Sequence, residues 1–150
     1  MKLIAWIMMM AFSSAIFAQQ PAANDQIVAT WTRNYEGGRS ENSLTAHSGV
    51  LESRSVSETG YTASYTVKLD NVRRFDKRSD KPKDSEFVPT TGFYVIQITT
   101  RGNQDIIRTY KDGHTKYVAS GMWFASFEPS QQKLRDDTYT KLCALIGQAP

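Results

Sequence analysis

One short stretch of the chain alternates strictly between apolar and polar residues, and this pattern limits the folds that the chain can adopt. Every second side chain from residue 61 to residue 69 is apolar, and the set is Tyr61, Ala63, Tyr65, Val67 and Leu69. Successive side chains of a β-strand point to opposite faces of the sheet, so this period predicts a strand with one buried and one solvated face. Because parallel sheets are covered on both faces, we expect an antiparallel sheet.

Strand-like segments continue on both sides of this stretch. A weaker one at 40–57 is interrupted by Ser48-Gly49, and Asp112-Gly113 is a sequence that favours a tight hairpin turn. The clearest remaining segments are rich in β-branched and aromatic residues and lie at 27–35, 93–99, 105–110 and 115–127. The chain therefore predicts a mainly β member of the α+β class: an antiparallel meander of about six strands, as an open sheet or a small barrel.

The segment 73–86 departs from the strand pattern. It holds six basic and four acidic residues around Pro82, and Pro89 follows it. Charge of both signs and proline are typical of a solvated connection, so we expect a long surface loop here.

The period changes after Pro129. Apolar residues and one threonine recur at helical spacing (Leu134, Thr138, Leu142, Leu145 and Ile146), opposite a charged face. Pro129 suits the first turn of a helix, and Gly147 suits the position after its end. We predict an amphipathic helix over 130–146 that packs on the sheet.

The N-terminus has the features of a secretory signal peptide. Lys2 precedes an apolar run, and Ala18 precedes the polar residues Gln19-Gln20. The run is shorter than the about 20 residues that span a bilayer. We therefore expect a signal peptide at 1–18, a single domain at 19–150, a periplasmic or secreted location, and no stable membrane insertion after cleavage.

Cysteine usage and charge restrict the classes of protein further. Cys143 is the single cysteine, so it is expected either to be buried between Leu142 and Leu145 or to link two chains in a homodimer. There are 18 basic and 15 acidic residues, and this near-balance does not indicate a nucleic-acid partner.

Sites for catalysis, metals and cofactors are not predicted. The two histidines, His47 and His114, do not belong to a metal-binding motif, no serine lies in a nucleophile-elbow motif, and no glycine loop precedes a helix. Burial of Cys143 would make it unreactive. A small α+β hydrolase that uses His47 or His114 with an aspartate is a less favoured alternative.

The remaining features favour a protein that binds another protein. Four cations of the charged segment and one aromatic residue are the candidate contacts: Arg73, Arg74, Lys77, Arg78 and Trp123. The leading hypothesis is an exported, non-enzymatic inhibitor or immunity protein that blocks a toxin or a hydrolase. The alternative is a small apolar ligand in a barrel-like pocket lined by Tyr65, Val67, Val95 and Trp123.

Overall fold

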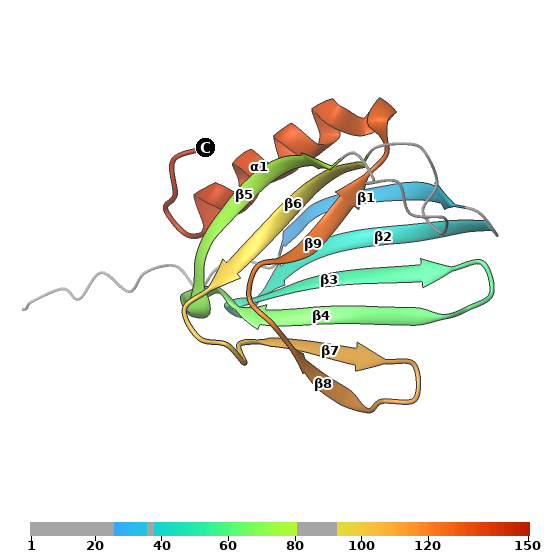
Figure 1. The fold of residues 1–150 in the computed structure, drawn as a ribbon, viewed down its shortest axis with the longest axis horizontal. Helices are drawn as coiled ribbons and strands as arrows, with labels where there is room; N and C mark the ends of the chain where they lie inside the picture. The colour runs from blue at the N-terminus through green and yellow to red at the C-terminus, as the bar shows by residue number, and fades with distance from the viewer. Residues whose placement is uncertain (1–25, 36–37, 81–92) are drawn as a thin grey trace, which may run out of the picture.

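The computed structural model describes residues 26–35, 38–80 and 93–150, which form two antiparallel sheets and one C-terminal helix. The signal-peptide segment 1–18 lies outside the described residues. The larger sheet has the order β1-β2-β3-β4-β7-β8, and the smaller has the order β5-β6-β9 (Figure 1). The predicted class is confirmed, and within these described residues the sheets do not close into a barrel.

The strands of the larger sheet are β1 (Gln26–Tyr35), β2 (Gly38–His47), β3 (Val50–Ser57), β4 (Thr62–Lys68), β7 (Ile106–Tyr110) and β8 (Thr115–Val118). Those of the smaller sheet are β5 (Val72–Asp80), β6 (Phe93–Thr100) and β9 (Met122–Phe127). Short 3-10 turns, Leu69–Asn71 and Pro129–Gln131, precede β5 and α1 (Gln132–Leu145).

The break predicted at Ser48-Gly49 is a two-residue hairpin turn between β2 and β3. His47 pairs with Val50 across it, and φ is +48° at Ser48 and +77° at Gly49. Positive φ at both positions is the geometry that matches the right-handed twist of two antiparallel strands. The register that follows places Leu44, Ala46 and Leu51 in the core.

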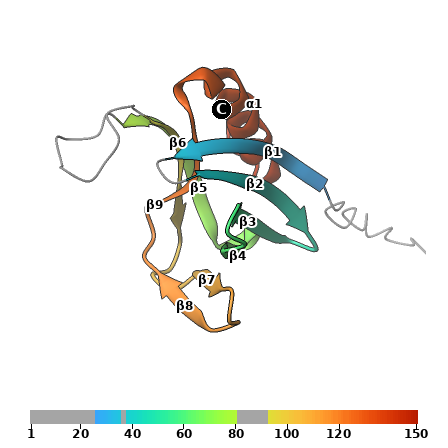
Figure 2. The same cartoon turned by 90° about the vertical axis from the view of Figure 1, so that its right-hand side faces the viewer.

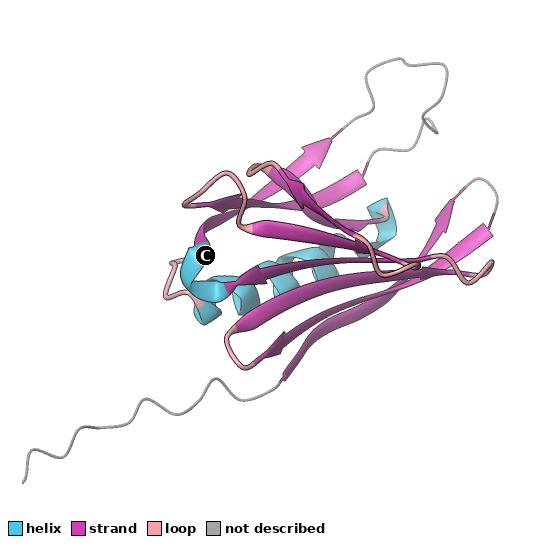
Figure 3. Cartoon of the chain, turned by 90° about the horizontal axis from the view of Figure 1, so that it is seen from below, coloured by secondary structure: helices cyan, strands magenta, loops and turns pink. Residues whose placement is uncertain are grey.

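The core lies where one face of the smaller sheet packs on one face of the larger, with α1 beside both (Figures 2 and 3). The rings of Trp31 on β1 and Phe127 on β9 stack with centroids 4.6 Å apart. Phe75, Ile96 and Leu142, from β5, β6 and α1, are fully buried beside them. Packing of the two sheets buries Ala63 and Val67 of the apolar face that the alternation at 61–69 predicted, whereas Tyr61 on the same face is 46% exposed.

Two predicted boundaries are wrong. Residues 73–80, expected in a loop, belong to β5, an edge strand paired with the strongly β-forming β6. An edge strand tolerates charges because they project to solvent or onto the neighbouring helix, so local composition concealed this strand. The rest of the expected loop, 81–86, lies outside the described residues.

The segment 115–127 is two strands and not one. Gly121, with φ of +85°, lies between β8 of the larger sheet and β9 of the smaller, so the chain changes sheets there. The sequence predicted one strand over this segment; the change of sheet depends on pairings with β7 and β6 that the segment itself does not encode.

The helix is present as predicted, but its buried face is rotated. Its buried residues are Arg135, Thr138, Tyr139, Leu142 and Cys143. Leu134, Leu145 and Ile146 pack only partly against the core. Arg135 and Tyr139 take the expected place of apolar residues because of their contacts with the smaller sheet. The guanidinium carbon of Arg135 is 4.8 Å from the ring centre of Tyr94 on β6, and Tyr139 contacts Lys77 on β5.

Candidate functional site

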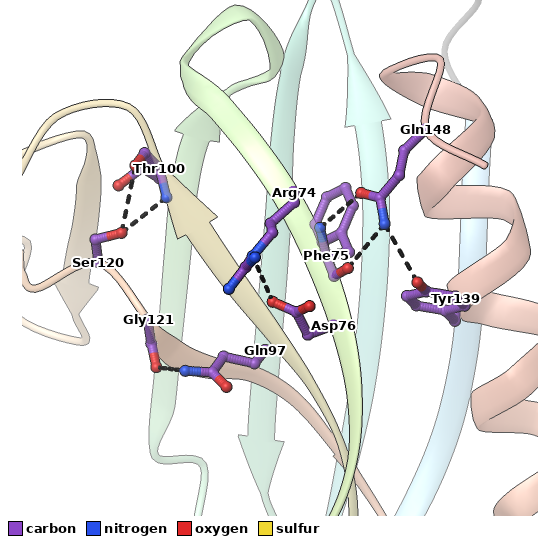
Figure 4. A network of polar contacts seen from close by, with 9 residues as sticks. All are labelled: Arg74, Phe75, Asp76, Gln97, Thr100, Ser120, Gly121, Tyr139 and Gln148. Atoms are coloured by element: carbon purple, nitrogen blue, oxygen red, sulfur yellow. Dashed lines mark hydrogen bonds and ion pairs between the residues drawn. The ribbon is translucent and has the colours of Figure 1, made fainter. Parts of the chain in front are cut away.

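The four cations predicted as contacts lie on β5 and do not form one surface. Arg74 makes an ion pair with Asp76, with a distance of 2.9 Å from Nε to Oδ2 (Figure 4). The ammonium of Lys77 is 4.9 Å from the centre of the Tyr139 ring, on the side of the strand that faces α1. Lys77 therefore helps attach the helix to β5.

Arg78 and Arg73 complete this set. The carbonyl of Arg78 accepts a hydrogen bond of 3.1 Å from the guanidinium of Arg135, while both Arg73 and Arg78 have exposed side chains. Trp123 belongs to β9, but its side chain lies outside the described residues. A contribution of these residues to binding stays a prediction.

The residues of the alternative apolar pocket are separated. Val67 belongs to the core between the sheets. Val95 alternates along β6 with Ile96 and Tyr94, which contact that core, so it points to the opposite face of the smaller sheet. Tyr65 is only partly buried at the margin of the core.

A different cluster gathers around Arg108 on β7. Because β4 pairs with β7, Tyr65 lies directly opposite Arg108 and Ala63 lies opposite Tyr110. The guanidinium carbon of Arg108 is 4.5 Å from the ring centre of Tyr110 and 5.5 Å from that of Tyr65. Its Nη2 donates a hydrogen bond of 3.1 Å to the hydroxyl of Tyr61. One cation is thus held by three tyrosines.

The turn after β7 extends the cluster. The ring of His114 stacks on Tyr110, with centroids 4.2 Å apart, and the carboxylate of Asp112 contacts both the backbone N–H and the ring of His114. We call the group Tyr61, Tyr65, Arg108, Tyr110 and His114 the Arg108 surface. An open hollow of about 500 Å³ adjoins it and is lined by Tyr61, Tyr110, Lys111, Asp112 and His114.

Electrostatics keep this surface cationic. Partial burial acts to lower the pKa of Arg108, but its interactions with Tyr65, Tyr61 and Tyr110 outweigh burial and raise the pKa above its ordinary value. The backbone N–H of His114, and then its ring, hold the pKa of Asp112 below its usual range. Arg108 is therefore charged throughout the physiological range, and Asp112 serves to order the turn.

The arrangement suits binding through stacking and hydrogen bonds. Tyrosine and arginine are enriched at the centres of protein interfaces because they combine a large apolar area with polar tips. The alternation at 61–69 placed Tyr61 and Tyr65 on the face of a strand that was expected to be buried. The pairing of β4 with β7, which skips β5 and β6, was the missing information.

The two histidines lie in exposed positions, and this bears on the acid–base and metal-binding alternatives. The His114–Asp112 pair lies in an exposed turn, with side chains 60% and 69% exposed, and His47 is at the exposed end of β2. Within residues 26–35, 38–80 and 93–150, no three His, Cys, Asp or Glu side chains cluster so that they could hold a metal ion. In the same ranges no helix is both long and apolar enough to cross a membrane.

Comparisons with known proteins do not assign this chain to a family. No family model matches it, no curated protein is similar to it, and no solved structure matches its fold.

Proposed function

We propose that this chain is an exported, non-enzymatic binding protein that recognises another protein through the Arg108 surface. The observation that carries the proposal is the fixed position of Arg108 between the rings of Tyr65 and Tyr110, with a hydrogen bond to Tyr61. A side chain that is already ordered loses little conformational entropy on binding, so its contacts contribute more fully to affinity.

The most concrete form of this function is an inhibitor or immunity protein that blocks a toxin or a hydrolase. Three features support it: a signal-like N-terminus, a two-sheet scaffold with a buried core, and an aromatic and cationic surface at one end of the larger sheet. On this hypothesis the β7–β8 end would cover the partner's active cleft, and the mechanism would be steric.

The test is a capture experiment with three forms of the protein, each expressed from the full sequence with a tag after Pro150. The forms are the unchanged protein, Arg108→Ala, and Arg78→Ala as a matched control on β5. Removal of an arginine at the energetic centre of an interface costs about 2 kcal/mol or more, which corresponds to about thirtyfold in Kd. We expect one stoichiometric protein partner with the unchanged protein and with Arg78→Ala, and its loss with Arg108→Ala.

Two results would contradict the proposal. If Arg78→Ala loses the partner while Arg108→Ala keeps it, the binding surface is on β5, as the sequence first predicted. If the unchanged protein captures no stoichiometric partner, the protein-binding function is wrong. Thermal denaturation of each variant shows whether a loss of binding reflects a loss of fold.

A further inference from the structure

The edges of the two sheets differ in how their backbone groups are satisfied. The edge strands are β1 and β8 in the larger sheet and β5 and β9 in the smaller. An exposed edge presents unpaired N–H and C=O groups, which can bind another extended chain. Which edge stays open therefore indicates where a partner strand can pair.

Side chains from the C-terminal region occupy the edge of β1. The ammonium of Lys141 donates to the carbonyl of Val28 at 3.1 Å, and the amide of Gln131 donates to the carbonyl of Thr32 at 2.8 Å. The N–H of Asn34 donates to a carboxylate oxygen of Glu128 at 2.5 Å. Three backbone groups along this edge are thus occupied.

The edges of the smaller sheet are occupied in the same way. On β5 the amide of Gln148 accepts from the N–H of Phe75 at 2.8 Å and donates to its carbonyl at 2.9 Å (Figure 4). On β9 the carbonyl of Ser126 accepts from the indole of Trp31 at 2.9 Å. The carbonyl of Phe124 accepts from the hydroxyl of Ser53 at 2.8 Å.

The edge of β8 is different. The N–H of Tyr110 donates to the carbonyl of His114 at 3.1 Å, so these two residues form a hydrogen-bonded pair between β7 and β8. Thr109 and Thr115 are the next pair along the ladder, and Arg108 and Lys116 follow them. Because hydrogen-bonded pairs alternate in an antiparallel ladder, Thr115 and Tyr117 direct their backbone groups outward. No hydrogen bond to these outward groups comes from the part of the chain that the structure describes, and the side chain of Tyr117 is 58% exposed.

Charge around this edge indicates the kind of segment that can pair with it. Lys116 lies opposite Arg108 on the same face of the hairpin, and Lys111 lies in the adjoining turn. Asp112, the acidic residue of that turn, already contacts His114. A second copy of the chain would bring the same cations to the edge, whereas an acidic segment would neutralise them.

We propose that an extended, acidic segment of the partner protein adds as a strand to the outer edge of β8. Its backbone pairs with the N–H and C=O groups of Thr115 and Tyr117, and acidic side chains on one of its faces lie opposite Lys116 and near Arg108. The inference rests on the proposed function and specifies how the partner is recognised.

The test uses a capped peptide in which Glu alternates with Thr and Val over nine residues, added to the isotope-labelled protein and followed by NMR. We expect the largest amide shifts at Thr115 and Tyr117. A peptide with Lys in place of Glu is expected to bind at least tenfold more weakly. Two N-methylated peptides are then compared, one methylated at its odd-numbered residues and the other at its even-numbered residues. We expect one of them to lose binding and the other to keep it, because only one edge of an added strand pairs with β8.

Two variants examine the protein side of the contact. Tyr117→Pro removes an outward N–H, which an edge strand tolerates, and Tyr117→Thr keeps the N–H while removing the ring. We expect loss of peptide binding with the first and a change of less than about threefold with the second. Three results would overturn the proposal: peptide-induced amide shifts that are largest elsewhere in the protein, equal binding of the two N-methylated peptides, or undiminished peptide binding to Tyr117→Pro.

The same variants separate this inference from the proposed function. If the natural partner is lost with Arg108→Ala but retained by Tyr117→Pro, the Arg108 surface binds the partner without strand addition, and this inference is wrong. If Tyr117→Pro also loses the partner while Tyr117→Thr retains it, strand addition is supported. Dimers of the chain that dissociate with Tyr117→Pro would show that the occupant is a second copy, which contradicts the inference.

Discussion

Gln148 supplies the most quantitative prediction, because one side chain attaches the end of the helix to the edge of β5. Gly147 adopts φ of +67°, and the N–H of Gln148 returns to the carbonyl of Cys143 at 2.9 Å. This helix-ending turn points the Gln148 amide at both backbone groups of Phe75, and the same amide donates to the hydroxyl of Tyr139 at 3.2 Å.

The cost of removing this amide can be worked from these contacts. Gln148→Ala deletes two bonds to backbone groups and one weaker bond to Tyr139, and each bond contributes about 0.5–1.5 kcal/mol net. We therefore expect a loss of about 2 kcal/mol in the free energy of unfolding. For a domain of this size, that loss lowers Tm by roughly 6–12 °C.

Urea denaturation and calorimetry of the full chain measure this loss. Gln132→Ala is the matched control, because Gln132 is exposed at the first turn of α1, and we expect a change within about 0.5 kcal/mol. Gln148→Met keeps the length of the side chain without its hydrogen bonds, so it is expected to be as destabilising as alanine to within about 1 kcal/mol. If Gln148→Met is as stable as the unchanged protein, the reasoning from hydrogen bonds is refuted.

Three further predictions concern the core and the β7–β8 turn. Leu142→Ala, at a fully buried position of α1, is expected to lower the free energy of unfolding by about 2–5 kcal/mol, and a loss below about 1 kcal/mol in urea denaturation would contradict its place in the core. Cys143 is fully buried, and burial raises the pKa of its thiol, so a thiol reagent at neutral pH is expected to label it only after unfolding; rapid labelling of the folded protein would refute this. Because the folded-state pKa of Asp112 is lowered, its contact with His114 persists above the ordinary aspartate range and is lost as pH falls through the lowered value. An NMR titration of the His114 amide is therefore expected to show a midpoint below about 3.9, and a midpoint at or above that value would count against the contact.

Local signals in the sequence were sufficient for several elements of the fold. The alternation at 61–69, the interruption at Ser48-Gly49 and the helix stop at Gly147 each depend on residues close together in the chain. Their physical causes, which are strand periodicity and the conformational freedom of glycine, act over a few residues. Cys143 was expected to be buried or to link two chains, and its complete burial in the structure supports the first alternative.

Tertiary contacts decided the features that sequence analysis missed. Residues 73–80 form a strand because β6 pairs with them and because Tyr139 and Arg135 of α1 contact Lys77 and Arg78. Local charge density cannot reveal those partners. The Arg108 surface depends likewise on the pairing of β4 with β7, strands separated in the chain by a pair that joins the other sheet.

The central claim, that the β7–β8 end of the larger sheet contacts a partner protein, is tested most directly by photo-crosslinking in living cells. A photoreactive benzoylphenylalanine replaces Tyr117 in one strain and Arg73 in another, so that β8 and β5 are compared at exposed positions. The account predicts a crosslink to one discrete protein from position 117 and none to that protein from position 73. A crosslink from position 73 alone, or from neither position, would contradict it.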